Sequence, residues 1–122
     1  MVNIKSVTLS AEATEKPIFT LVGQNSDGIT VCMQNRSSAN FFTYRFQESQ
    51  VNIDDEFTNI EEGNGNFGVS GILAPLKRAM VNVRTSSPYI RLVGDSSGGA
   101  DIEVDVIQLI QDGSNVFNSG TM

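Results

Sequence analysis

The chain has 122 residues, 39% hydrophobic and 18% charged, which suits one compact domain rather than a disordered chain. Its net charge is −6 and its eight Lys and Arg are scattered, so we expect no nucleic-acid partner and no binding to an anionic membrane. The chain contains no His, and its single Cys32 cannot form a disulfide within the chain. We therefore expect no enzyme, no metal and no cofactor, and we turn to binding and structural roles.

The first predicted strand covers residues 2–9. Its apolar positions change phase, because Val2 and Ile4 share one face whereas Val7 and Leu9 share the other. This change predicts either a bulge near residues 5–6 or burial of the strand on both faces. No basic segment followed by an apolar run precedes the strand, so we expect no secretory signal.

Two further strands are predicted over residues 18–22 and 29–34. Ile29, Val31 and Met33 alternate with polar residues or Cys, which is typical of a half-buried strand. Asp27-Gly28 supplies the positive φ that a tight turn needs, so the two strands are predicted to form a hairpin.

An aromatic strand is predicted over residues 41–47. Phe42, Tyr44 and Phe46 lie on one face and are assigned to the core. The following residues 47–63 contain six of the fourteen acids and irregularly spaced apolar residues. We expect a solvated acidic excursion, partly a strand, because the order of its carboxylates does not match a calcium loop.

The last third of the chain contains clear strand patterns over residues 81–83, 89–93 and 102–106. The segment before them, 72–80, is predicted to be a loop or a single turn, because Pro75 interrupts its helical pattern. The glycine-rich residues 94–99 are predicted to be a hairpin loop, since a phosphate-binding loop would precede a helix.

These elements predict an all-β, antiparallel β-sandwich, jelly-roll-like, with about seven to eight strands. Residues 1–110 form the single domain, within which residues 1–9 are a possible strand-exchange or docking arm. Residues 111–122 form a polar, loosely ordered tail.

Few residues are candidates for chemistry. Asp101, Glu103 and Asp105 alternate along one strand, which indicates the solvent face of a half-buried sheet rather than a hydrolase centre. Cys32 is assigned a packing role. Tyr89 is the one free candidate for an aromatic platform that would bind a receptor or a carbohydrate, a separate hypothesis for this chain.

Two segments carry a resemblance to a known family. FFTYRFQESQVNIDDEFTNI (41–60) and VNVRTSSPYIRLVGDSSGGADIEVDVI (81–107) resemble small β-sandwich decoration, or cement, proteins and accessory virion proteins of tailed bacteriophages. The resemblance covers roughly residues 18–110. It departs at Phe57, where that family often has Trp.

The resemblance implies a structural virion protein that folds in the host cytoplasm and cements the outer surface of a phage capsid. Its partners would be the major capsid protein and further copies of the chain, as a homotrimer by analogy. The alternative is a receptor- or carbohydrate-binding module of a phage tail or fibre. The candidate interface combines the N-terminal strand with the apolar end of the last strand, namely Val2, Ile4, Val7, Leu9, Ile107, Leu109 and Ile110.

Overall fold

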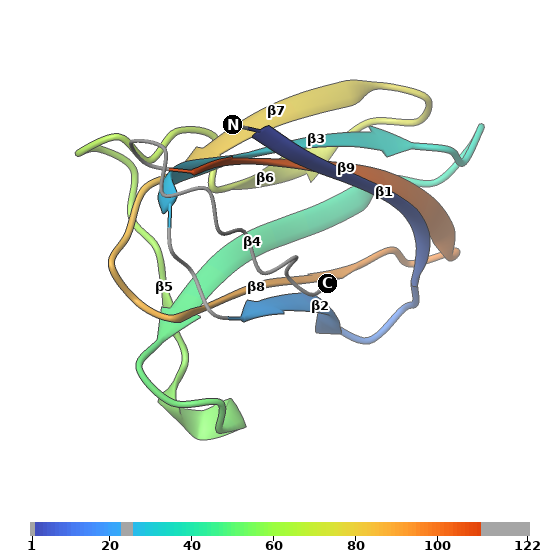
Figure 1. Ribbon diagram of the computed structural model, residues 1–122. Helices are drawn as coiled ribbons and strands as arrows, with labels where there is room; N and C mark the ends of the chain where they lie inside the picture. Colours follow the sequence, from blue (N-terminus) through green and yellow to red (C-terminus); the bar gives the residue numbers. More distant parts are fainter. Residues whose placement is uncertain (1, 23–25, 111–122) are drawn as a thin grey trace.

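The computed structural model describes residues 2–22 and 26–110, which form nine β-strands in two antiparallel sheets and one short 3₁₀ helix (Figure 1). The elements are β1 (Val2–Ala11), β2 (Lys16–Val22), β3 (Ser26–Asn35), β4 (Phe42–Ser49), η1 (Asp54–Glu56), β5 (Thr58–Asn59), β6 (Ser70–Leu73), β7 (Arg78–Val83), β8 (Tyr89–Asp95) and β9 (Ala100–Ile110). The four-stranded sheet has the order β1-β9-β3-β7. The five-stranded sheet has the order β2-β8-β4-β5, and β6 also pairs with β4. The predicted antiparallel sandwich is confirmed.

Most connections cross from one sheet to the other, and both predicted hairpins are therefore wrong. β2 pairs with β8, whereas β3 pairs with β7 and β9 in the opposite sheet. Asp27-Gly28 lies inside β3 at a register shift instead of forming a tight turn. The glycine-rich loop after β8 likewise leads across to β9. Turn residues indicate where the chain bends. Which strand each segment pairs with depends on how the apolar faces of the two sheets meet in the core.

β1 pairs with β9 without interruption, from Val2 opposite Leu109 to Ala11 opposite Ala100. The predicted bulge near residues 5–6 is therefore wrong, because the register is continuous through Lys5 and Ser6. None of the described strand pairs of β1 departs from the regular ladder.

The core lies between the two sheets. The aromatic prediction for β4 is confirmed: Phe42, Tyr44 and Phe46 are buried and contact one another through stacked and edge-to-face rings. From the facing sheet, β9 contributes the fully buried Ile102 and Val104, in the phase that the sequence indicated. These large apolar side chains hold the two sheets together.

Two segments differ from the expectation of a plain loop. Residues 72–80 contain the end of β6, a turn and the start of β7, so a strand over Ser70–Leu73 was missed. Within residues 47–63 the buried Phe57 and Ile60 anchor the excursion, while five of its six acids are exposed and Glu48 is half-buried. Among the described residues, no helix has the length and apolar character needed to cross a membrane.

Candidate assembly surfaces

The predicted interface is divided by the fold. Val7 and Leu9 are partly buried and pack against the core, opposite Val104 and Ile102 of the same chain, whereas they were predicted to lie at an interface. Ile107 follows the buried Val106 and lies partly exposed on the outer face of the four-stranded sheet. The backbone places Val2, Ile4 and Leu109 in the β1–β9 ladder, whereas Ile110 ends β9 opposite Ser26 of β3.

The outer edge of β1 carries free backbone groups. The amide of Arg36 donates to the carbonyl of Asp101 at 2.8 Å, so Asp101 directs its backbone groups toward β3 and away from β1. Its register partner Ser10 must then direct its own N–H and C=O away from β9, as must Thr8 two residues earlier. Among the described residues, no backbone group pairs with this edge over the length of β1. An open edge of this length is a template for a strand from another chain.

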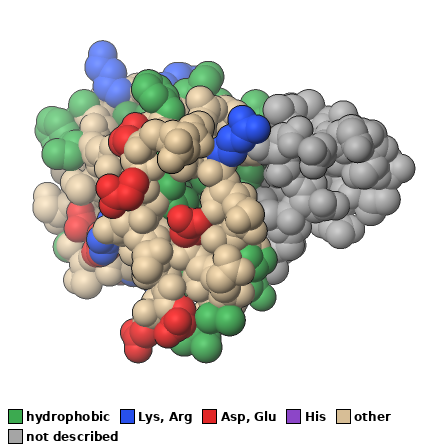
Figure 2. Space-filling model, turned by 90° about the vertical axis from the view of Figure 1, so that its left-hand side faces the viewer, with side chains coloured by type: hydrophobic (Ala, Val, Ile, Leu, Met, Phe, Trp, Pro, Cys, Tyr) green, Lys and Arg blue, Asp and Glu red, His purple; other side chains and the backbone are tan. Residues whose placement is uncertain are grey.

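The acidic excursion forms a projecting tip, which we call the acidic tip (Val51, Ile53 and Asp54–Glu56). The five side chains are exposed, and Ile53 has 57% of its surface accessible. Figure 1 places η1 beyond the ends of the strands, and Figure 2 shows acidic and hydrophobic side chains together at this lowest point of the molecule. Exposed apolar side chains beside charges are typical of contact surfaces.

Arg91 of β8 positions the acidic tip. Its guanidinium donates to Gln47 Oε1 at 2.8 Å and to Asp54 Oδ1 at 2.9 Å, and it lies 4.0 Å from the centre of the Phe57 ring. Phe57 is buried beneath the tip. The sheet therefore fixes both ends of η1, and the sequence offered no local signal for this long-range contact.

A second projecting surface lies at the opposite end of β4, which we call the basic corner (Arg36, Phe41 and Leu76–Arg78). Phe41 and Leu76 each have 55% of their surface accessible. Lys77 and Arg78 are exposed and form no ion pair with the described residues, whereas Arg36 lies 3.6 Å from Glu103. The sequence separates these cations by forty positions, and the fold brings them to one corner.

The buried Asn35 holds the basic corner together. Its side-chain amide donates to the carbonyls of Asn40 and Leu73 at 2.8 and 3.1 Å, and its Oδ1 accepts from the amide of Ser37 at 2.9 Å. The loop after β3 and the turn after β6 are thus fixed to one side chain. Nothing in the sequence pattern indicates this role of Asn35, because a polar residue at the end of a strand is typical of a loop.

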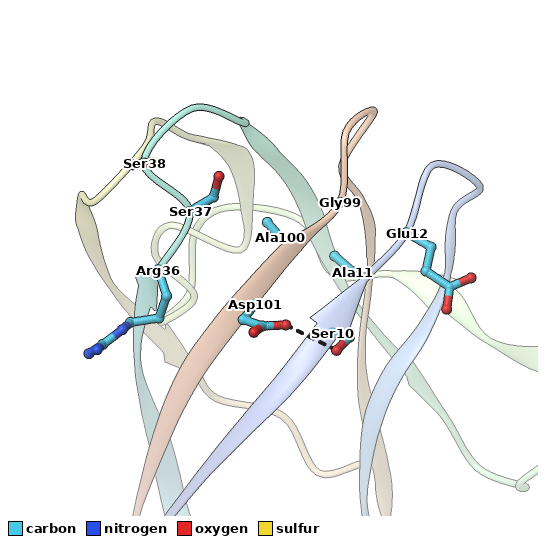
Figure 3. A pocket seen from close by; sticks show the side chains of 9 residues that line it. All are labelled: Ser10, Ala11, Glu12, Arg36, Ser37, Ser38, Gly99, Ala100 and Asp101. Atoms are coloured by element: carbon cyan, nitrogen blue, oxygen red, sulfur yellow. Dashed lines mark hydrogen bonds between the residues drawn. The ribbon is translucent and has the colours of Figure 1, made fainter.

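An open hollow of about 650 Å³ lies at the ends of β1 and β9 (Figure 3). Ser10 Oγ donates to Asp101 Oδ1 at 3.1 Å, and the Arg36 side chain extends away from the loops. Ser37 Oγ accepts the amides of Ala39 and Asn40 at 3.1 and 2.8 Å. The Ser37 hydroxyl therefore stabilises the loop after β3, and the Ser10 hydroxyl links β1 to β9 through the Asp101 carboxylate.

The remaining predicted site residues stay apart. Tyr89 is half-buried in β8, where its backbone lies between Val22 of β2 and Ser49 of β4. Cys32 is a half-buried free thiol on β3. Within the described residues, no group of three or more Cys, Asp or Glu side chains converges as a metal site would require.

Comparison with known proteins identifies the fold but no family. No family model matches the chain, and no curated protein matches it. A subunit of Bacillus endospore appendages, described as disulfide-linked pili, superposes with a TM-score of 0.58 and 12% identity over 91% of this chain and 88% of that one. A crystal structure of PirA superposes with a TM-score of 0.52 and 12% identity, covering 84% of this chain and 91% of PirA.

These matches correct the predicted function. The prediction of a phage capsid decoration protein, with a phage tail or fibre module as the alternative, is wrong, because the similar structures are an endospore appendage and PirA. The local patterns on which the resemblance depended are those of many sandwiches: an aromatic strand, an acidic turn and an alternating last strand. At 12% identity the comparison shows the shared fold alone.

Proposed function

We propose that the chain is a non-enzymatic structural subunit that assembles with copies of itself into a pilus-like appendage on a cell or spore surface. The observation that carries the proposal is the shared fold with the endospore appendage subunit, which extends over 91% of this chain. The open edge of β1 supports it, because sheets that continue from one subunit to the next need such an edge.

A fibre made of copies of this chain needs noncovalent contacts. A subunit with one cysteine can form one disulfide, and one disulfide joins at most two copies. Disulfides alone therefore cannot join copies of these 122 residues into a fibre, although the similar appendage is described as disulfide-linked. In the proposal, the copies are joined by backbone pairing at β1 and by contacts between side chains.

The test compares two substitutions at one position of the open edge. Thr8→Pro removes an N–H that points away from β9, so the ladder within the subunit keeps its hydrogen bonds. Thr8→Val keeps the N–H and is the matched control. Light scattering and negative-stain electron microscopy over rising protein concentration are expected to show multi-subunit assemblies for the natural chain and for Thr8→Val. Thr8→Pro is expected to stay folded and assemble less.

A natural chain that remains a monomer up to millimolar concentration would contradict the proposal. If Thr8→Pro and Thr8→Val assemble equally well, the copies do not pair through the open edge of β1. Circular dichroism and urea unfolding show that each variant is folded before its assembly is compared.

A further inference from the structure

The acidic tip and the basic corner lie at opposite ends of the sandwich. Phe41 of the basic corner immediately precedes β4, and Val51 of the acidic tip follows it by two residues. The seven residue steps of β4 separate the two surfaces by about 23 Å. A subunit therefore carries one surface at each end of a rigid, central strand (Figure 1).

The two surfaces are complementary in both charge and apolar character. Asp55 and Glu56 are exposed and form no ion pair with the described residues, as is also true of Lys77 and Arg78. Each end also exposes apolar side chains beside its charges; they are Val51 and Ile53 at the tip and Phe41 and Leu76 at the corner. Opposite charges around an apolar contact favour association and fix its orientation.

We infer that the acidic tip of one subunit docks on the basic corner of the next copy, head to tail. Two different surfaces at opposite ends make a heterologous contact, and such a contact repeats into an open filament unless its rotation closes a ring. This inference rests on the proposed function and names the contact that would continue the fibre.

A second copy fits these surfaces better than another partner. Nucleic acid is disfavoured by the net charge of −6, and the basic corner has only three cations, one of which pairs with Glu103. Every copy of the chain carries one acidic tip and one basic corner, so the two complementary surfaces are present in equal amounts. The contact is small, so we expect each single junction to be weak and the repeated array to be stable.

Two charge-reversed variants test the contact directly. Asp55→Lys/Glu56→Lys disables the tip and keeps the corner, whereas Lys77→Glu/Arg78→Glu disables the corner and keeps the tip. Asp54 is left unchanged because it binds Arg91. Glu12→Lys/Glu61→Lys changes the net charge as much as the tip variant does, at exposed positions outside both surfaces, and is the control.

By analytical ultracentrifugation, each reversed variant alone is expected to associate about tenfold or more weakly than the natural chain. Mixing the two variants is expected to restore association, because the intact corner of the first variant meets the intact tip of the second, and the reversed tip of the first is again opposite in charge to the reversed corner of the second. Salt of about 1 M, where charges are screened beyond about 3 Å, is expected to dissociate these mixed assemblies.

The outcomes separate this inference from the proposed function. If the natural chain assembles and the reversed variants assemble equally well, the head-to-tail contact is wrong while the structural role stands. If the mixture stays monomeric, the contact is wrong irrespective of what the natural chain does. If the mixture associates more strongly than either variant alone although the natural chain forms no fibres, the contact stands and the fibre is wrong.

Discussion

The two outer edges of the four-stranded sheet are treated differently by the chain. At β7, the amide of Phe67 donates to Asn82 O at 2.8 Å, Asn82 returns a bond at 2.9 Å, and Asn66 Oδ1 accepts the amide of Arg84 at 2.7 Å. At β1, no described residue provides such cover. Within residues 2–22 and 26–110, the backbone of the chain therefore closes one edge of this sheet and leaves the other edge unpaired.

The cover over β7 is itself held from the opposite sheet. The Glu62 carboxylate accepts the amides of Gly68 and Val69 at 3.2 and 2.9 Å, and the Tyr44 hydroxyl donates to Gly68 O at 3.1 Å. Gly68 has a φ of 72°, a conformation that favours glycine. Three substitution experiments, given in order of decreasing effect, test how much the packing and the cover at each edge contribute to the stability of the fold.

The first change is the same truncation on both edge strands. Val81→Ala on β7 is expected to lower the free energy of unfolding by about 2 to 3 kcal/mol, because Val81 is fully buried and a cavity remains. Val7→Ala on β1 is expected to cost about 1 kcal/mol, because Val7 is only partly buried. Urea unfolding measures both. Equal costs would show that the two edges are equally well packed.

The second change disrupts the cover over β7. In Gly68→Val the added Cβ would lie 3.2 Å from the carbonyl of Met80, and the residue would be strained at positive φ. We expect a loss of about 2 kcal/mol in urea unfolding. Gly28→Ala, whose Cβ would meet its nearest atom at 3.5 Å without a positive φ, is the control and is expected to change stability little. A Gly68→Val variant as stable as the natural chain would refute the tight cover.

The third change tests the hydroxyl that ties the cover to β4. Burial, and secondarily the charge of Glu62, raise the pKa of Tyr44 above its usual value of 10.0. The folded chain then keeps a proton that the unfolded chain releases, so stability is expected to fall as the pH rises above about 10. Tyr44→Phe is expected to cost about 1 kcal/mol at neutral pH and to reduce this alkaline fall.

Tyr89→Phe is the matched control for this pH series, because it removes a tyrosine and leaves the Tyr44 hydroxyl in place. Its alkaline fall in urea unfolding should equal that of the natural chain. If Tyr44→Phe shows the same fall as well, another group causes the pH dependence.

Local patterns located many of the strands correctly, and they failed at the choice of pairing partner. Alternation identified the buried faces of β4 and β9, because period-two burial is a property of a few consecutive residues. The Asp27-Gly28 signal was read as a hairpin, yet β2 and β3 belong to different sheets. A turn propensity acts over four residues, whereas sheet membership depends on which apolar faces meet across the core.

The sequence by itself determined that this protein is an acidic, all-β chain with one free thiol and a projecting acidic segment. The tertiary structure alone decided that Val7 and Leu9 pack against the core, that no strand of the described residues pairs with the outer edge of β1, and that Arg36 and Lys77 reach one corner. Composition and periodicity are properties of neighbouring residues. Edges and surface patches arise from residues far apart in the chain, and they exist only once the two sheets have packed.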